Sequence, residues 1–207
     1  MTTGGRPPRP APPDLGPAVC ALGRGEVVAI PTDTVYGLAV DPGQAGATDA
    51  LFALKARPRS LDLPVLVDGE EQAGLLAAGG LPPPARRLAA AFWPGGLTLV
   101  VPRRAGLSWD LGPHGDTIGL RVPDHDLARA LCREVGPLAT SSANRHGEDP
   151  CTDASSVTAA FGGGLVVVDG GRCAGVPSTV VAVTDGETRC LREGAVPWAD
   201  IRRVAGD

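Results

Sequence analysis

Short apolar runs alternate along the chain with segments in which apolar residues recur every three or four positions. Runs that predict buried strands lie at residues 26–31, 64–67, 97–102, 117–123, 137–144, 165–171, 178–184 and 188–194. Helical periodicity lies at residues 14–24, 48–57, 70–78, 84–92, 125–135, 151–161 and 197–204. The last three strands follow one another closely, which favours antiparallel pairing among them. The pattern therefore predicts an α/β fold with a mixed sheet and helices outside it.

Polar residues and prolines indicate where these elements end. Thr48 or Asp49 is expected to begin the second helix, which ends before Pro58. Thr152 is the candidate N-cap of the helix at 151–161. Residues 1–13 are rich in Pro and Gly and are expected to form a flexible tail. Residues 14–207 are then expected to form one domain, because domains usually hold roughly 100–200 residues.

The composition is that of an ordinary globular protein, with 43% hydrophobic and 20% charged residues. The net charge of -4 argues against sequence-blind nucleic-acid binding, which usually needs a basic surface. The chain start lacks the apolar core of a signal peptide, and no run reaches the roughly 18 apolar residues of a membrane span, so we expect a cytoplasmic protein. Five cysteines without a C-x-x-C pair and three scattered histidines predict neither a disulfide framework nor a structural metal site.

Polar residues gather in four places where a predicted strand or helix ends. The first, residues 31–38, offers hydroxyls for a small polar ligand, although a turn capped by its own Thr and Asp side chains is the simpler interpretation. The second, residues 55–59, holds three cations at a helix end. They complement the helix dipole, which composition alone favours, or they clamp phosphates.

The other two clusters follow predicted strands in the second half of the chain. Arg121 lies inside the otherwise apolar strand at 117–123, and its burial requires an anion. An internal Asp or Glu and a ligand carboxylate or phosphate are both open. Residues 140–144 could donate hydrogen bonds to such a ligand, although a Ser/Asn turn is the simpler interpretation. The usual glycine-rich nucleotide loops and the nucleophile elbow are absent from the sequence.

The order of these clusters resembles that of the YrdC-type threonylcarbamoyl-AMP synthase family in its short, single-domain form. The matching segments are PTDTVYGL (31–38), KARP (55–58), PVLV (64–67), WPGGLTLV (93–100), TIGLRVPDH (117–125), TSSAN (140–144), VVDGG (167–171), VPSTVV (176–181) and CLREGAV (190–196). Each is weak alone, but together they cover nearly the whole chain in the family's order. The resemblance implies a twisted mixed sheet around a large concave nucleotide-binding cavity.

The resemblance also implies an activity and a set of site residues. The reaction joins L-threonine, bicarbonate and ATP into threonylcarbamoyl-AMP and pyrophosphate, with Mg²⁺ carried by the nucleotide, for the later modification of tRNA by partner proteins. Its implied catalytic residues, which hold the ATP phosphates, are Lys55 and Arg57. Further implied ATP contacts are Thr117, Ser142, Asn144, Thr152 and Arg192. Implied threonine contacts are Thr34, Arg121, Ser142 and Ser178.

Arg121 thereby gains the anion that its strand position requires. A guanidinium already neutralised by an internal acid would count against that pairing. The chain also departs from the family pattern in the loop at residues 59–68: Leu63 replaces a common Asn before Pro64, and Asp68 replaces a common His. The rival functions are a nucleotide- or RNA-binding paralogue without synthase activity, a carbamoyl-transfer domain that uses carbamoyl-AMP, and a structural module.

Overall fold

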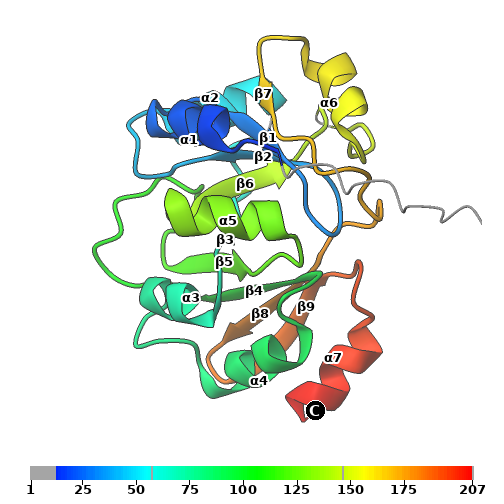
Figure 1. Cartoon of the computed structure of the whole chain (residues 1–207). Helices are drawn as coiled ribbons and strands as arrows, with labels where there is room; N and C mark the ends of the chain where they lie inside the picture. Colours follow the sequence, from blue (N-terminus) through cyan, green and yellow to red (C-terminus); the bar gives the residue numbers. More distant parts are fainter. Residues whose placement is uncertain (1–12, 57, 146, 207) are drawn as a thin grey trace, which may run out of the picture.

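Nine strands in the described part of the chain form one mixed sheet (Figure 1). The computed structural model describes residues 13–56, 58–145 and 147–206. The strands, in order across the sheet, are β7 (Val166–Val167), β1 (Val28–Ile30), β2 (Gly37–Val40), β6 (Leu138–Ser142), β3 (Val65–Leu66), β5 (Thr117–Arg121), β4 (Leu97–Pro102), β8 (Thr179–Thr184) and β9 (Glu187–Arg192). The β7–β1, β3–β5 and β4–β8 pairs are parallel, and the other five are antiparallel. The predicted mixed sheet is confirmed.

Helices form in each segment where the apolar periodicity predicts one. They are α1 (Gly16–Gly23), α2 (Ala47–Lys55), α3 (Glu70–Leu76), α4 (Pro83–Phe92), α5 (Asp126–Glu134), α6 (Ala154–Phe161) and α7 (Trp198–Ala205). None of these described helices is long and apolar enough to cross a bilayer. The predicted tail at residues 1–13 lies outside the described residues, apart from Pro13.

Two predicted helix starts are wrong. The N-cap of α2 is Gly46, whose φ of 75° is a left-handed conformation that suits glycine, rather than Thr48 or Asp49. The N-cap of α6 is Asp153, not Thr152. The Asp153 carboxylate accepts the N–H of Ser156 at 2.8 Å, and the Asp153 N–H donates to the Ser156 hydroxyl at 3.3 Å. This capping box satisfies helix-end donors on both sides, which a threonine one residue earlier does not do.

Two expectations about strands also need correction. The last three strands do not pair together: β8 and β9 are antiparallel neighbours, but β7 lies at the opposite edge, parallel to β1. Strands that are close in sequence are separated in space here, because the chain passes from one edge of the sheet nearly to the other between β7 and β8. The structure also adds a strand, β2, that the pattern does not reveal. All four of its residues are buried, so it shows no alternation of apolar and polar positions.

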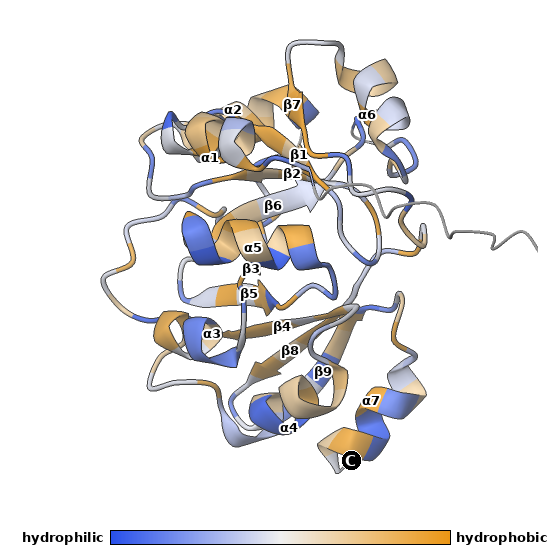
Figure 2. Cartoon of the chain, viewed as in Figure 1, coloured by the Kyte–Doolittle hydropathy of each residue, from blue (hydrophilic) through white to orange (hydrophobic). Residues whose placement is uncertain are grey.

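Buried apolar side chains form two clusters. Several strands of the sheet, β4 and β8 among them, have the orange of hydrophobic residues in Figure 2. Along β1, Val28 and Ile30 join the cluster under α1 and α5, whereas Ala29 joins the cluster that contains α2, α4 and α7 residues. This alternation follows from the two-residue period of a strand. Cys132 of α5 is fully buried, and burial raises the pKa of its thiol to about 12, so its predicted core position is confirmed.

Leu120 tests the contribution of the central strands to stability. Its side chain is fully buried in β5 between partners in β3 and β4. Leu120→Ala should lower the free energy of unfolding by about 2–5 kcal/mol, because a cavity replaces packed atoms. Urea denaturation measures the loss. Leu75→Ala, at a side chain that is 60% exposed, is the control and should change stability by less than about 0.5 kcal/mol. Equal effects of the two substitutions would contradict this account of the core.

Candidate active site

Three of the four polar clusters border strands that lie close together in the sheet, and the second lies at the end of α2. Gly37, which begins β2, pairs with Ser142 at the end of β6. Leu66 of β3 opposes both Arg121 at the end of β5 and Leu138 at the start of β6, so Arg121 and Ser142 lie toward opposite ends of these strands. Segments far apart in sequence thereby border one cavity that spans the strands between them.

A cavity of about 130 Å³, here called the arginine cavity, lies against the central strands. It is lined by Thr32, Thr34, Val35, Gly37, Pro64, Leu66, Thr98, Arg121, Thr140, Ser141, Ser142, Pro177, Ser178 and Arg192. The lining combines hydroxyl groups and two guanidinium groups with a few apolar side chains. Such a surface suits a small ligand that carries an anionic group.

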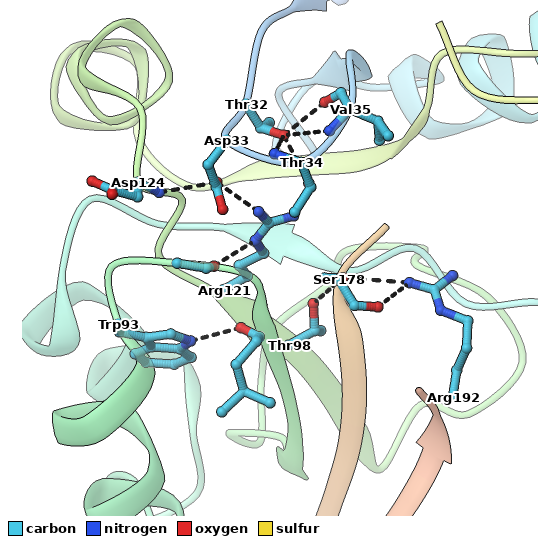
Figure 3. A network of polar contacts seen from close by, with 12 residues as sticks. Thr32, Asp33, Thr34, Val35, Trp93, Thr98, Arg121, Asp124, Ser178 and Arg192 are labelled. Atoms are coloured by element: carbon cyan, nitrogen blue, oxygen red, sulfur yellow. Dashed lines mark hydrogen bonds and ion pairs between the residues drawn. The ribbon is translucent and has the colours of Figure 1, made fainter. Parts of the chain in front are cut away.

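Arg121 is buried at the wall of this cavity and is held by two segments, the loop before β2 and the turn at Gly95 (Figure 3). Its Nε donates to the Gly95 carbonyl at 2.9 Å, its Nη1 donates to the Thr34 hydroxyl at 2.8 Å, and its Nη2 donates to the Asp33 carboxylate at 2.6 Å. A guanidinium carries five N–H donors. Within the described part of the chain, the other two have no acceptor.

The Asp33 carboxylate answers one of the questions that the sequence leaves open. An internal acid does pair with Arg121, which is the first of the two alternatives left open, and this counts against a ligand as the sole source of its anion. Burial lowers the pKa of the Arg121 guanidinium, and the charge of Asp33 opposes that effect. Asp33 neutralises the charge without exhausting the donors, so Arg121 can still bind a second oxygen ligand at the cavity wall.

The loop before β2 combines a structural turn with a cavity surface. The Thr32 hydroxyl donates to the Val35 carbonyl at 2.6 Å and accepts the N–H groups of Thr34 and Val35 at 3.2 Å each. The capped-turn interpretation therefore holds for Thr32. Thr34 belongs to the same loop, but its hydroxyl accepts from Arg121 and lines the cavity, as expected for a ligand contact.

Lys55, the only lysine of the chain, lies beside Ser142 and Asn144. Its Nζ lies 2.6 Å from the Ser142 carbonyl, 3.1 Å from the Ser142 hydroxyl, 3.2 Å from the Asn144 carbonyl and 2.7 Å from the Asn144 side-chain oxygen. The ammonium is buried in this network rather than solvated at the helix end. The structure thus brings three predicted phosphate contacts together, and Arg57, the fourth, lies outside the described residues.

A second cavity of about 280 Å³, here called the apolar cavity, adjoins the first. Both cavities are lined by Pro64, Thr98, Ser178 and Arg192. The remaining lining of the apolar cavity is Leu61, Asp62, Leu63, Val100, Leu111, His114, Thr117, Ile118, Gly119, Val180 and Leu191. Thr117 and Arg192, two of the predicted ATP contacts, therefore line a cavity whose walls are mainly aliphatic. The arginine cavity adjoins it.

The wall shared by the two cavities is a chain of hydrogen bonds (Figure 3). The Thr98 and Ser178 hydroxyls lie 2.9 Å apart, and Arg192 Nη2 donates to the Ser178 carbonyl at 2.7 Å. Thr98 and Asp33 are site residues that the sequence reasoning missed. Thr98 gave no signal because it lies within an apolar strand, whereas Asp33 stands inside a segment already identified as polar.

Among the described residues, Thr152, like Lys55 and Asn144, is absent from the lining of both cavities. Its carbonyl accepts the N–H of Cys173 at 2.8 Å, at the start of a loop whose Gly175 N–H donates to the Thr34 carbonyl at 2.7 Å. Thr152 therefore supports the loop that covers the Thr34 segment.

Two glycine positions allow the site segments to approach one another. A Cβ on Gly96 would lie 2.7 Å from the Ala195 side chain, and a Cβ on Gly194 would collide with the backbone of Pro177 and Ser178. The Gly96 carbonyl accepts the N–H of Thr179 at 2.9 Å. These close contacts explain why glycine stands in the segments 93–100 and 190–196, which meet at the start of β8.

Polar contacts connect residues 59–63, in the loop that departs from the family pattern, to the loop at 107–116. Arg59 pairs with Asp110 at 2.7 Å and also with Asp49, and the Asp62 carboxylate lies 2.8 Å from the His114 ring. Both loops supply walls of the apolar cavity. The unusual loop therefore remains part of the site. The described residues hold no cluster of three or more His, Cys, Asp or Glu that could bind a metal ion.

Comparison with known proteins identifies the family. A sequence model described as Sua5/YciO/YrdC, telomere recombination, matches residues 20–194. The chain belongs to the Sua5/YciO/YrdC family. A Bacillus subtilis relative named threonylcarbamoyl-AMP synthase is 37% identical over 198 residues, which are 94% of this chain and 57% of the relative. A provisionally named synthase from Mycobacterium tuberculosis is 42% identical over 194 residues, which are 91% of this chain and 88% of that protein.

Solved structures of the Sua5/YciO/YrdC family share the fold. The crystal structure of Pyrococcus abyssi Sua5 complexed with L-threonine matches with a TM-score of 0.83 at 35% identity, over 91% of this chain and 56% of that one. The chain therefore spans about half the length of that relative. Escherichia coli YciO matches with a TM-score of 0.79 at 23% identity, which supports the fold. The α/β fold expected from the resemblance is thus confirmed.

The buried position of Lys55 has a measurable consequence. Lys55→Met removes the ammonium but keeps most of the side-chain volume, so the Ser142 and Asn144 oxygens lose a shared donor. The free energy of unfolding should fall by about 1–3 kcal/mol, since buried acceptors are left unsatisfied. Thermal or urea unfolding measures the change. Arg86→Met, which removes one positive charge from an exposed helix position, is the control and should be nearly neutral. A stability loss no greater than that of the control would contradict the role given to this network.

Proposed function

We propose that this protein is a threonylcarbamoyl-AMP synthase, which converts L-threonine, bicarbonate and ATP into threonylcarbamoyl-AMP and pyrophosphate. The observation that carries the proposal is the pair of adjoining cavities. One is small, polar and walled by Arg121, and the other is larger, aliphatic and bordered by Arg192. Relatives named threonylcarbamoyl-AMP synthase, and a family structure complexed with L-threonine, support it.

The arginine cavity suits an amino acid. A carboxylate can accept the two remaining N–H donors of Arg121, and the hydroxyls of Thr34 and Ser178 line the same space. In our proposal these three residues bind threonine. Ser142 lies in the same cavity and contacts Lys55, so it stands between the amino acid and the phosphate-binding residues.

The apolar cavity suits a nucleoside, because its aliphatic walls can cover a base and Thr117 offers a hydroxyl. We assign the ATP contacts to Lys55, Arg57, Thr117, Ser142, Asn144 and Arg192. Thr152 stays a predicted ATP contact that rests on the resemblance alone. Mg²⁺ is expected to arrive with the nucleotide and to neutralise phosphate charge there.

The chemistry needs alignment more than a nucleophilic side chain. The threonine amine captures bicarbonate or carbon dioxide as a carbamate, whose oxygen attacks the α-phosphorus while pyrophosphate leaves. Holding both reactants beside one wall makes this step effectively intramolecular. The positive charges of Lys55 and Arg57 can stabilise the charge that develops on the phosphates. We assign these two residues the catalytic role on that basis.

A cytoplasmic location and transfer of the product to tRNA by partner proteins complete the proposal.

Pyrophosphate release tests the proposed function directly. Purified protein with ATP, Mg²⁺, bicarbonate and L-threonine should release pyrophosphate, and omission of threonine or bicarbonate should abolish the signal. Carbamoyl phosphate in place of threonine and bicarbonate tests the carbamoyl-transfer alternative. Pyrophosphate release that needs carbamoyl phosphate would favour that alternative. Nucleotide binding without release would favour the inactive paralogue.

Arg121→Lys tests the amino-acid side of the site. Lysine keeps the charge but loses the fork of donors, so the KM for threonine should rise about tenfold or more while the KM for ATP changes less than about twofold. Steady-state pyrophosphate release at varied threonine and varied ATP measures the two constants. Arg24→Lys, at an exposed arginine outside the lining of both cavities, is the control. An unchanged KM for threonine in Arg121→Lys would remove Arg121 from the threonine site.

A further inference from the structure

Asp33 is the acid closest to the proposed amino-acid site, yet it does not line either cavity. Its side chain is 20% exposed, and the side chain of Arg121 is 7% exposed. One Asp33 oxygen accepts both Arg121 Nη2 at 2.6 Å and the backbone N–H of Asp124 at 3.0 Å. A carboxylate fixed at two points, from two different segments, can determine the direction in which its guanidinium partner points.

The contacts of Arg121 are distributed so that its orientation is fully determined. Gly95 holds Nε, Thr34 holds one terminal nitrogen and Asp33 holds the other. In the view of Figure 3, Asp33 approaches the guanidinium from one side, and Ser178 and Arg192 lie on the other. The two donors left over belong to the terminal nitrogens. The guanidinium is planar, so the three contacts that hold it also fix the plane in which the two remaining N–H groups lie.

We propose that Asp33 is a positioning residue, which orients Arg121 from behind so that its two remaining N–H groups face the carboxylate of the amino-acid substrate. The inference rests on the proposed function, because it concerns the threonine site of that reaction. Asp33 does not touch the substrate. It acts through Arg121, and its anchor on the Asp124 backbone transmits the position of the loop after β5 to the loop before β2.

A counter-charge role makes a different prediction from a positioning role. If Asp33 served only to neutralise a buried guanidinium, its loss would expose more positive charge to the substrate carboxylate, and threonine would bind as well or better. If Asp33 sets the direction of the donors, its loss weakens threonine binding in spite of the added positive potential. Because the two roles move threonine affinity in opposite directions, the measured sign separates them.

The experiment compares Asp33→Ala, Asp33→Asn and Asp124→Asn. Asp33→Ala removes both the charge and the acceptor. Asp33→Asn keeps an amide oxygen that can accept the same two N–H groups. Asp124→Asn removes one negative charge from an exposed side chain of the adjoining loop and leaves its backbone N–H in place. The readouts are L-threonine binding by calorimetry without ATP, the KM values for threonine and ATP from pyrophosphate release, and the thermal unfolding midpoint.

Asp33→Ala should weaken threonine binding and raise the threonine KM by about tenfold or more, with the ATP KM within about twofold of wild type. Asp33→Asn should recover most of that loss, and Asp124→Asn should match wild type. Unchanged or tighter threonine binding in Asp33→Ala would overturn the proposal. Equal increases in both KM values would also overturn it, because they indicate general disruption of the fold.

Three further outcomes are informative. If Asp33→Ala does not fold, Asp33→Glu carries the test, because it keeps the negative charge but displaces the carboxylate by one methylene: a threonine-specific loss of binding supports positioning, and unchanged binding rejects it. If the wild-type protein binds threonine but releases no pyrophosphate, the proposed synthase function fails, and the calorimetric comparison still decides the role of Asp33. If the wild-type protein binds no threonine, both proposals fail.

Discussion

The burial of the Arg121 guanidinium against the β-sheet constrains the loops that surround the arginine cavity. A charged group at the end of a central strand is stable only if its donors find acceptors in a fixed geometry. Here the acceptors come from the loop before β2, from the Gly95 turn and from an aspartate anchored to the loop after β5. Hydrogen bonds through Arg121 and Asp33 therefore connect the three loops, and these loops surround the cavity beside Arg121.

A second consequence of the sheet order is the shared wall between the two cavities. Strands β4 and β8 are parallel neighbours, so Thr98 and Ser178 bring their hydroxyls within 2.9 Å on adjacent strands. Arg192 reaches the same point from β9. In the proposed reaction this wall lies between the amino acid and the nucleotide, where a new bond to phosphorus must form. Strand pairing then supplies the precision that catalysis by alignment requires.

The helices and most strands could be predicted from local pattern, because most of the described helices bury apolar residues three or four positions apart. The predictions failed where tertiary context decides. β2 is covered on both faces and shows no alternation, β7 crosses to the far edge, and Asp153 outcompetes Thr152 as a cap because Ser156 reciprocates. Within the site, Thr34, Ser142 and Ser178, which the resemblance groups as threonine contacts, line one cavity. The partner of Arg121 could not be predicted, because the Asp33–Arg121 pair spans 88 residues and only the fold brings it together.

The single lysine of this chain is enclosed by the oxygens of Ser142 and Asn144, and its side chain is almost entirely removed from solvent. The described surface of the protein therefore carries its positive charge as arginine alone. Reagents and modifying enzymes that acylate, alkylate or conjugate the ε-amine of lysine find no accessible target there. If ligand binding loosened the hydrogen bonds of Lys55, its amine would become accessible. Covalent labelling of this one position would then report whether the proposed phosphate site is occupied.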